Sequence, residues 1–90
     1  LELDVDACRL TRAGKAVELT PVEYRIMELM MSHPGRVFTK QQIYEAGWEE
    51  SYLAADNNVM VCISKLRGKL SDDPGAYIST VRGLGYRLEG

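Results

Sequence analysis

The last third of the chain predicts a helix followed by a β-hairpin, and this pair constrains the fold more than any other feature of the sequence. Over residues 56–70, apolar side chains recur at the three- and four-residue spacing of an amphipathic helix. Residues 77–88 contain two strand-like runs on either side of a Gly-Leu-Gly turn at 83–85. Between helix and hairpin, residues 71–75 read Ser-Asp-Asp-Pro-Gly, a run typical of a turn. The hairpin therefore carries Arg82 at a glycine-flanked tip.

The helix expected over 56–70 has two different faces. At about 100° per residue, the core stripe consists of Val59, Ile63, Leu66 and Leu70, with Cys62 at its edge. The opposite face carries Asn57, Val61, Ser64 and Gly68, flanked by Asn58 and Lys65. This mix suits a DNA major groove, where Asn pairs with adenine, Lys reaches guanine and an aliphatic group packs on a thymine methyl. The helix alone leaves an alternative open, an ordinary amphipathic helix whose Asn pair is an N-terminal cap.

The hairpin favours the DNA interpretation. Residues 80–86 read Thr-Val-Arg-Gly-Leu-Gly-Tyr, which places Arg82 beside a flexible turn. An arginine on a projecting hairpin can enter a minor groove or hold a phosphate. Glycine is common in hairpins, so the turn by itself is weak support. No helix is expected after this glycine turn, which argues against a nucleotide-binding loop.

The preceding residues predict a small sheet and two more helices. Residues 1–19 alternate apolar and polar side chains, turn at Ala13-Gly14, and place Cys8 in a strand. Thr-Pro-Val-Glu at 20–23 is a capping box that begins a helix ending near residue 32. Thr-Lys-Gln-Gln at 39–42 is a second capping box, and its helix over 40–46 is expected to stop at Gly47. We therefore expect an α+β fold with an N-terminal antiparallel sheet (1–19), a three-helix core (20–70) and a hairpin (77–89).

Charge is distributed unevenly along a chain that is long enough for one small domain. The 90 residues carry a net charge of −2, but residues 1–56 carry −4 and residues 57–90 carry +2. Because a protein docks with one face, the positive charge of residues 57–90 matters more for DNA binding than the net charge of the whole chain. The negative charge of residues 1–56 should nevertheless limit non-specific DNA affinity. There is no signal peptide, and no apolar run approaches the roughly 18 residues that span a bilayer. Strand-like sequence from Leu1 onward suggests a domain cut from a longer protein.

Neither a metal site nor a catalytic constellation is expected. Cys8 and Cys62 have no paired spacing, so we expect reduced core thiols and no metal or cofactor. Asp72-Asp73 is a carboxylate pair only by adjacency within a turn. Ser64 has no positioned histidine, because His33 belongs to a helix-ending turn. Enzyme activity is therefore the least favoured function.

Together these motifs resemble the winged-helix DNA-binding domain of OmpR/PhoB-type response regulators. The similarity covers nearly the whole chain through the segments 19–24, 33–43, 59–70 and 80–88. The resemblance implies a winged helix-turn-helix fold with a four-stranded N-terminal sheet, three helices and a C-terminal wing. It implies transcriptional control by binding double-stranded DNA, with helix 56–70 in the major groove and wing 77–88 at the adjacent minor groove.

The resemblance also assigns roles to individual positions. Groove-facing positions are Asn57, Asn58, Val61, Cys62, Ser64, Lys65 and Arg67, with Thr80 and Arg82 from the hairpin. Positions that hold the DNA backbone are Arg36, Thr39 and Trp48. A loop over 48–55 that contacts RNA polymerase would carry Trp48, Glu49, Glu50 and Tyr52. The chain departs from the family at 57–58, 60–62 and 64, where family members often carry Arg-Thr, Asp-Val-His and a cation. Fewer cations predict fewer phosphate contacts and a shallower salt dependence.

The implied partners are those of a two-component system. The resemblance implies an absent N-terminal receiver domain phosphorylated by a sensor histidine kinase, in a cytoplasmic protein. It implies a head-to-tail dimer on direct-repeat DNA, and we expect the isolated domain to be a monomer. Two alternatives remain open: a receiver-less membrane activator of ToxR type as the parent, or a winged-helix module used for protein contacts. The low charge, the outward Val61 and the aromatic, acidic loop over 48–55 motivate the second alternative.

Overall fold

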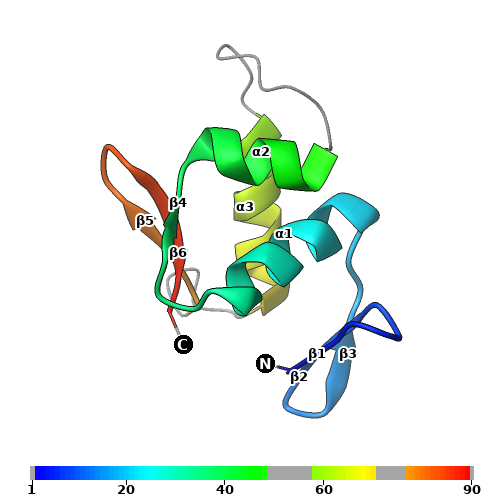
Figure 1. The fold of residues 1–90 in the computed structure, drawn as a ribbon. Helices are drawn as coiled ribbons and strands as arrows, with labels where there is room; N and C mark the ends of the chain where they lie inside the picture. The colour runs from blue at the N-terminus through cyan, green and yellow to red at the C-terminus, as the bar shows by residue number, and fades with distance from the viewer. Residues whose placement is uncertain (1, 49–57, 71–76, 90) are drawn as a thin grey trace.

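Three helices form the centre of the molecule, with one small sheet at each side (Figure 1). The computed structural model describes residues 2–48, 58–70 and 77–89. In chain order the elements are β1 (Glu2–Asp4), β2 (Arg9–Arg12), β3 (Lys15–Val17), α1 (Pro21–Ser32), β4 (Val37–Phe38), α2 (Lys40–Trp48), α3 (Asn58–Leu70), β5 (Ile78–Val81) and β6 (Gly85–Leu88). The α+β fold predicted from the sequence is confirmed.

The N-terminal sheet has three described strands, whereas the family resemblance implied four. They lie in the order β1-β2-β3 and pair antiparallel, with Leu3 opposite Leu10 and Leu10 opposite Val17. Leu10 is 1% exposed and anchors the sheet on the helical core. The prediction that Cys8 is a core thiol in a strand was wrong. Cys8 is exposed at φ 51° in the turn between β1 and β2, where the Asp4 carboxylate accepts the Ala7 N–H at 3.1 Å.

Helix α1 begins as its capping box predicts. The Glu23 N–H donates to Thr20 Oγ1 at 3.2 Å, and the Thr20 N–H donates to Glu23 Oε1 at 2.8 Å. These bonds satisfy two donors that a helix start leaves unpaired. The inner face of α1 carries the fully buried residues Ile26, Met27 and Met30.

Helix α2 begins at the second capping box but does not stop at Gly47. It continues to Trp48, whose ring stacks on Tyr44 with 4.8 Å between centroids. A Cβ added at Gly47 would lie 3.0 Å from Ile26 Cγ1 and 3.2 Å from Val22 Cγ1. The glycine therefore permits close packing of α2 against α1, and the prediction that it ends the helix was wrong. Trp48 consequently belongs to α2 instead of to a loop.

The C-terminal hairpin is part of a three-stranded sheet in the order β4-β6-β5. The short extended segment near Phe38 joins it, because Phe38 pairs with Tyr86 of β6. A Cβ at Gly85 would collide with the Phe38 carbonyl oxygen, so this close approach of β6 to β4 requires glycine.

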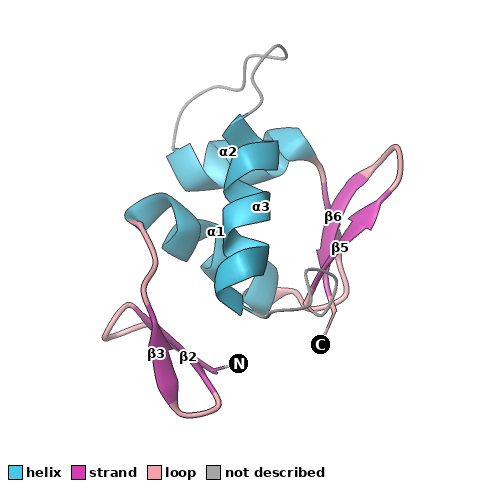
Figure 2. Cartoon of the chain, turned by 180° about the vertical axis from the view of Figure 1, so that it is seen from behind, coloured by secondary structure: helices cyan, strands magenta, loops and turns pink. Residues whose placement is uncertain are grey.

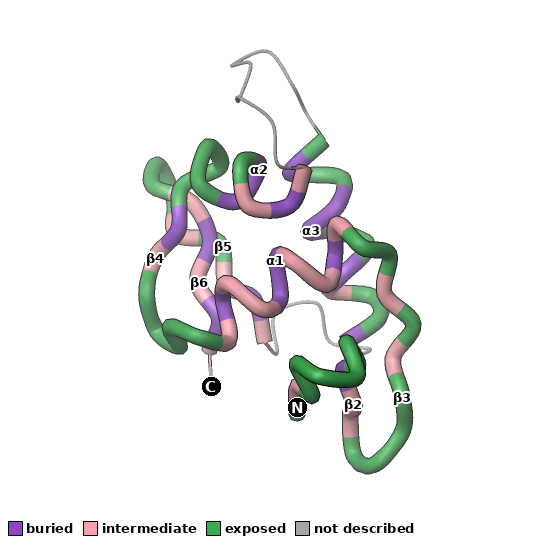
Figure 3. The backbone as a smooth tube through the Cα atoms, turned by 45° about the vertical axis from the view of Figure 1, so that its right-hand side comes forward, coloured by how far each residue is buried: buried purple, intermediate pink, exposed green. Residues whose placement is uncertain are grey.

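All three helices and both sheets contribute buried residues to one core cluster, and buried and exposed positions alternate along each helix (Figure 3). From α3 the core receives Val59, Cys62, Ile63, Leu66 and Leu70, which is the stripe predicted by periodicity. From the hairpin it receives Ile78, Tyr86 and Leu88. Within the described residues, no helix is long and apolar enough to cross a membrane.

Candidate nucleic-acid interface

Helix α3 lies at the front of the molecule in Figure 2, and its exposed residues carry little charge. Val61 is 51% exposed, and Asn58, Ser64, Lys65 and Gly68 are also exposed. The two faces predicted for this helix are therefore confirmed for its described residues. Asn57, the remaining position assigned to this outer face, lies outside the described residues.

Cys62 does not belong to the outer face. It is only 9% exposed and packs with the core cluster. Burial, together with the nearby Glu23 carboxylate, raises the pKa of the Cys62 thiol to about 11, although Lys65 and Lys69 oppose this shift. The thiol is therefore protonated at neutral pH. Cys62 also lines a hollow beside Asn58, Val61 and Lys65, so the base-contact role that the family resemblance implied for it stays a prediction.

Arg67 is turned toward the wing instead of outward. Its Nε donates to the Ile78 carbonyl at 3.1 Å, and its Nη2 donates to Thr80 Oγ1 at 2.7 Å. The guanidinium also lies over the Tyr86 ring, 5.6 Å from the centroid. Arg67 is half-buried by these contacts, which the periodicity of the helix did not predict.

Two further cations of the C-terminal part are held by carboxylates. Lys69 Nζ lies 2.6 Å from Glu23 Oε1, and Arg87 Nη2 lies 2.8 Å from Glu89 Oε1. With Arg67, which bonds to the wing, three of the five Lys and Arg residues in 57–90 therefore have partners within the domain. The remaining two, Lys65 and Arg82, are exposed. Within the described part of this region, Lys65 and Arg82 are therefore the exposed cations for which the structure shows no carboxylate partner.

Glu23 is an acid whose environment favours the charged form. Burial alone would raise the pKa of Glu23, but hydrogen bonds from Lys69 and Thr20 outweigh it and lower the pKa below its ordinary value. Because Glu23 belongs to α1 and Lys69 to the last turn of α3, the pair joins two helix ends. The capping-box motif predicted the bond with Thr20, but no sequence signal indicated the lysine.

The wing tip projects beyond the body of the molecule. Arg82, Gly83 and Leu84 form the turn, which is closed by a 2.9 Å hydrogen bond from the Leu84 N–H to the Val81 carbonyl. Arg82 is exposed, and Leu84 is 64% exposed beside it. The tip thus pairs a cation with an apolar side chain.

A hollow of about 480 Å³ separates the wing from the helices. Its lining includes Thr39, Lys40, Met60, Thr80, Arg82 and Leu84. Met60 is 49% exposed, and sequence reasoning did not include it among the candidate site residues. Its spacing four residues before Ser64, along the outer stripe of α3, is the signal that could have found it. The start of α2, Met60 of α3 and the wing tip thus line one hollow.

Comparison with known proteins identifies the family. A family model described as "Transcriptional regulatory protein, C terminal" matches residues 14–88. The response regulator GtcR of Aneurinibacillus migulanus is 45% identical over 85 residues, covering 91% of this chain. The DNA-binding domain of response regulator AdeR, solved in complex with an intercistronic region, matches 99% of this chain and 93% of its own with TM-score 0.85 and 31% identity. The response regulator DrrB, a Thermotoga maritima OmpR/PhoB homologue, matches 98% of this chain with TM-score 0.84 and 28% identity. The chain belongs to the OmpR/PhoB family of DNA-binding domains.

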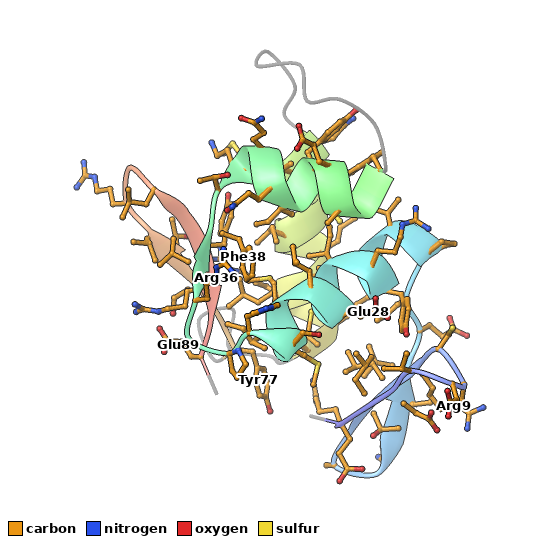
Figure 4. The ribbon with its side chains drawn as sticks, viewed as in Figure 1. Arg9, Glu28, Arg36, Phe38, Tyr77 and Glu89 are labelled. Carbon is orange, nitrogen blue, oxygen red and sulfur yellow. The ribbon has the colours of Figure 1, made fainter. Side chains whose placement is uncertain are left out.

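This OmpR/PhoB-type domain spans 35% of the length of GtcR and 41% of the DrrB chain. The three positions expected to hold the DNA backbone lie just before β4, at the start of α2 and at the end of α2. Arg36 is exposed and lies over the Phe38 ring, 5.2 Å from the centroid, beside the wing sheet (Figure 4). Thr39 is exposed at the start of α2 and lines the hollow described above. Trp48 borders a second hollow of about 280 Å³ beside Asn58, Val61 and Lys65.

The polymerase-contact positions Glu49, Glu50 and Tyr52 of the OmpR/PhoB resemblance lie outside the described residues. Trp48, the fourth position, ends α2 and is partly buried by its stack on Tyr44. Among the described residues, no cluster of His, Cys, Asp and Glu could hold a metal ion.

Proposed function

We propose that this domain binds double-stranded DNA sequence-specifically and controls transcription as the effector domain of a two-component response regulator. Helix α3 enters the major groove, and the wing reaches the adjacent minor groove. The observation that supports the proposal is that exposed Met60 of α3 and the Arg82 tip line one common hollow, while the exposed residues of α3 follow along the same helix. An open, cationic and weakly polar side of this kind fits a duplex better than a small ligand.

Base reading is assigned to three exposed residues of α3. Asn58 can pair bidentately with adenine, Lys65 can reach guanine, and Val61 can pack on a thymine methyl group. Ser64 and Gly68 are small, so the helix backbone can approach the groove floor. Cys62 is omitted from this set because it is buried.

Phosphate binding is assigned to the edges of the same side. The start of α2 at Thr39 and Lys40 lines the same hollow as the wing tip, and the N-terminus of a helix attracts anions. Arg36 and Arg82 add charge on the wing side, and Lys65 adds it on α3. Three cationic contacts predict that log K falls with log salt at a slope of about −2.7.

The implied partners follow from the same family membership. The chain spans only 35% of GtcR, which is named a response regulator, so we propose a parent protein with a receiver domain phosphorylated by a sensor histidine kinase. We further propose a cytoplasmic location, head-to-tail pairing on direct-repeat sites by a domain that is monomeric alone, and contact of the segment 48–55 with RNA polymerase.

Selection of bound duplexes from a random library, at low and moderate salt, tests this function. We expect enrichment of a direct repeat whose half-sites are about one helical turn apart. On that site, Lys65→Ala should relax sequence preference, whereas Arg82→Ala should weaken binding evenly across sequences. Arg9→Ala is the matched control, because Arg9 is an exposed arginine on the N-terminal sheet, away from the wing (Figure 4).

Two results would contradict the proposal. No enrichment at either salt would remove autonomous DNA binding and favour a protein-contact module that uses the exposed apolar residues Met60, Val61 and Leu84. Equal binding curves for Lys65→Ala, Arg82→Ala and Arg9→Ala would show that neither α3 nor the wing docks as described.

A further inference from the structure

Arg67 joins the two elements that the proposed function places on DNA. It belongs to α3, yet its hydrogen bonds end on the Ile78 carbonyl (3.1 Å) and the Thr80 hydroxyl (2.7 Å), both in β5. The Tyr86 ring of β6 lies against its guanidinium at 5.6 Å. One side chain of the recognition helix thus contacts both strands of the wing.

The base of the wing and the part near its tip are held by different contacts. The base of the wing is anchored by the buried residues Ile78 and Leu88, which pack in the core. Thr80 is exposed, and it stands only two residues before Arg82, about 7 Å along an extended strand. The bond from Arg67 to Thr80 therefore holds the wing close to its tip.

We infer that Arg67 is a positioning residue, which sets where the wing stands relative to α3 and so lets Arg82 and the outer face of α3 engage adjacent grooves together. This inference rests on the proposed function. It replaces the groove-facing role that the family resemblance implied for Arg67. Arg67 acts through Thr80, Ile78 and Tyr86, and its effect on DNA binding is transmitted by Arg82.

The residue type fits a positioning role. A guanidinium is planar and presents donors in a rigid fork, so it can bond a carbonyl and a hydroxyl at once and lie flat on an aromatic ring. An ammonium group is a point charge that cannot reproduce this set of contacts. Lysine would, in contrast, substitute adequately if residue 67 served only to neutralise a phosphate.

The experiment compares Arg67→Lys, Arg67→Met and Thr80→Val in the 90-residue domain, titrated against the duplex selected above. We expect both Arg67 variants to lose about tenfold in affinity, the scale of one lost arginine contact. Thr80→Val keeps the arginine and the strand, and should lose about threefold. Arg9→Gln, which removes an exposed arginine from the N-terminal sheet, is the charge control and should stay within about twofold of wild type.

A double-mutant cycle with Arg82→Ala separates positioning from direct contact. If Arg67 positions the wing, Arg82→Ala should cost about tenfold in the wild type but less than about twofold in the Arg67→Met background, because a displaced wing no longer delivers the arginine. If Arg67 instead contacted a phosphate directly, the affinity losses of Arg67→Met and Arg82→Ala would multiply in the double variant, and Arg67→Lys would bind nearly as well as the wild type. That result would overturn the inference.

A measurement without DNA keeps the inference separate from the proposed function. Residual dipolar couplings report the orientation of β5 and β6 relative to α3, and circular dichroism confirms that each variant is folded. We expect Arg67→Met and Thr80→Val to change the wing couplings while those of α1 stay constant. Unchanged wing couplings in both variants would overturn the inference, whether or not the wild type binds DNA. Failure of the wild type to bind any duplex would overturn only the proposed function.

Discussion

Replacement of Lys69 by methionine should destabilise the domain in a pH-dependent way. Lys69 Nζ lies 2.6 Å from Glu23 Oε1, and the Glu23 side chain is only 4% exposed. Methionine keeps most of the aliphatic stem but leaves the Glu23 carboxylate with the Thr20 N–H as its described hydrogen-bond donor. The variant therefore isolates the cost of a buried carboxylate that has lost its cation.

The magnitude follows from how deeply the pair is buried. Removing one partner of a fully buried ion pair costs roughly 3–5 kcal/mol. The Lys69 side chain is 36% exposed, so solvent screens the pair and the cost should fall to about 2 kcal/mol. For a domain of this size, that loss lowers the melting temperature by about 10 °C.

The pH dependence should reverse between wild type and variant. In the wild type the folded pKa of Glu23 is lowered below its ordinary value of 4.5, because hydrogen bonds from Lys69 and Thr20 outweigh the effect of burial. Its contribution to stability is therefore present above pH 4.5 and is lost as pH falls through the lower folded pKa. In Lys69→Met burial dominates and raises that pKa, so stability is lost as pH rises above 4.5.

Urea unfolding followed by circular dichroism between pH 3 and pH 8 would measure both effects. Glu23→Gln is the matched control, because glutamine can also close the capping box with Thr20. The double variant Glu23→Gln/Lys69→Met should be more stable than Lys69→Met at pH 7, since it contains no unpaired buried charge. Equal stability of these two variants, or a destabilisation independent of pH, would refute the reasoning.

Two further predictions concern the wing turn and the thiols. Gly85→Ala should lower the free energy of unfolding by at least about 3 kcal/mol, because its Cβ collides with the Phe38 carbonyl. Gly83→Ala, at φ 80° but in open space, should lower it by only about 1 kcal/mol. Chemical denaturation measures both losses, and equal values would contradict the close approach of β6 to β4. The exposed Cys8 should react with a thiol reagent in the folded domain, while Cys62, buried and with its pKa raised to about 11, should react only on unfolding. Two equally fast thiols at pH 8 would show that Cys62 is accessible.

The elements of the fold could be predicted wherever their cause is local. Both capping boxes close hydrogen bonds between residues three apart, at Thr20 and Glu23 and at Thr39 and Gln42, so four residues of sequence contain the whole interaction. The two faces of α3 follow from helical periodicity in the same way. The wing strands could be placed because glycines mark the turn between them.

Glycine and cysteine show where local patterns fail. Gly47 carries a helix-stop signal, yet in the structure it is the point where α2 packs against Val22 and Ile26 of α1. Cys8 fits the alternation of a strand, but the turn after β1 places it in solvent. For Gly47 the packing partners that decide the structure lie on α1, distant along the chain. For Cys8 the deciding hydrogen bonds are local, from the Ala7 N–H to Asp4 and from the Cys8 N–H to the Val5 carbonyl.

The sequence by itself determined the fold class, the helix starts, the core stripe of α3 and the tip that carries Arg82. Only the tertiary structure decided which cations face outward. Arg67 donates to acceptors 11 and 13 residues away, and Lys69 pairs with Glu23 46 residues away, so both cations are engaged by groups that an isolated helix would not contain. Charge and periodicity are properties of a segment, but the pairing of a charge depends on which groups the folded chain brings within hydrogen-bond distance.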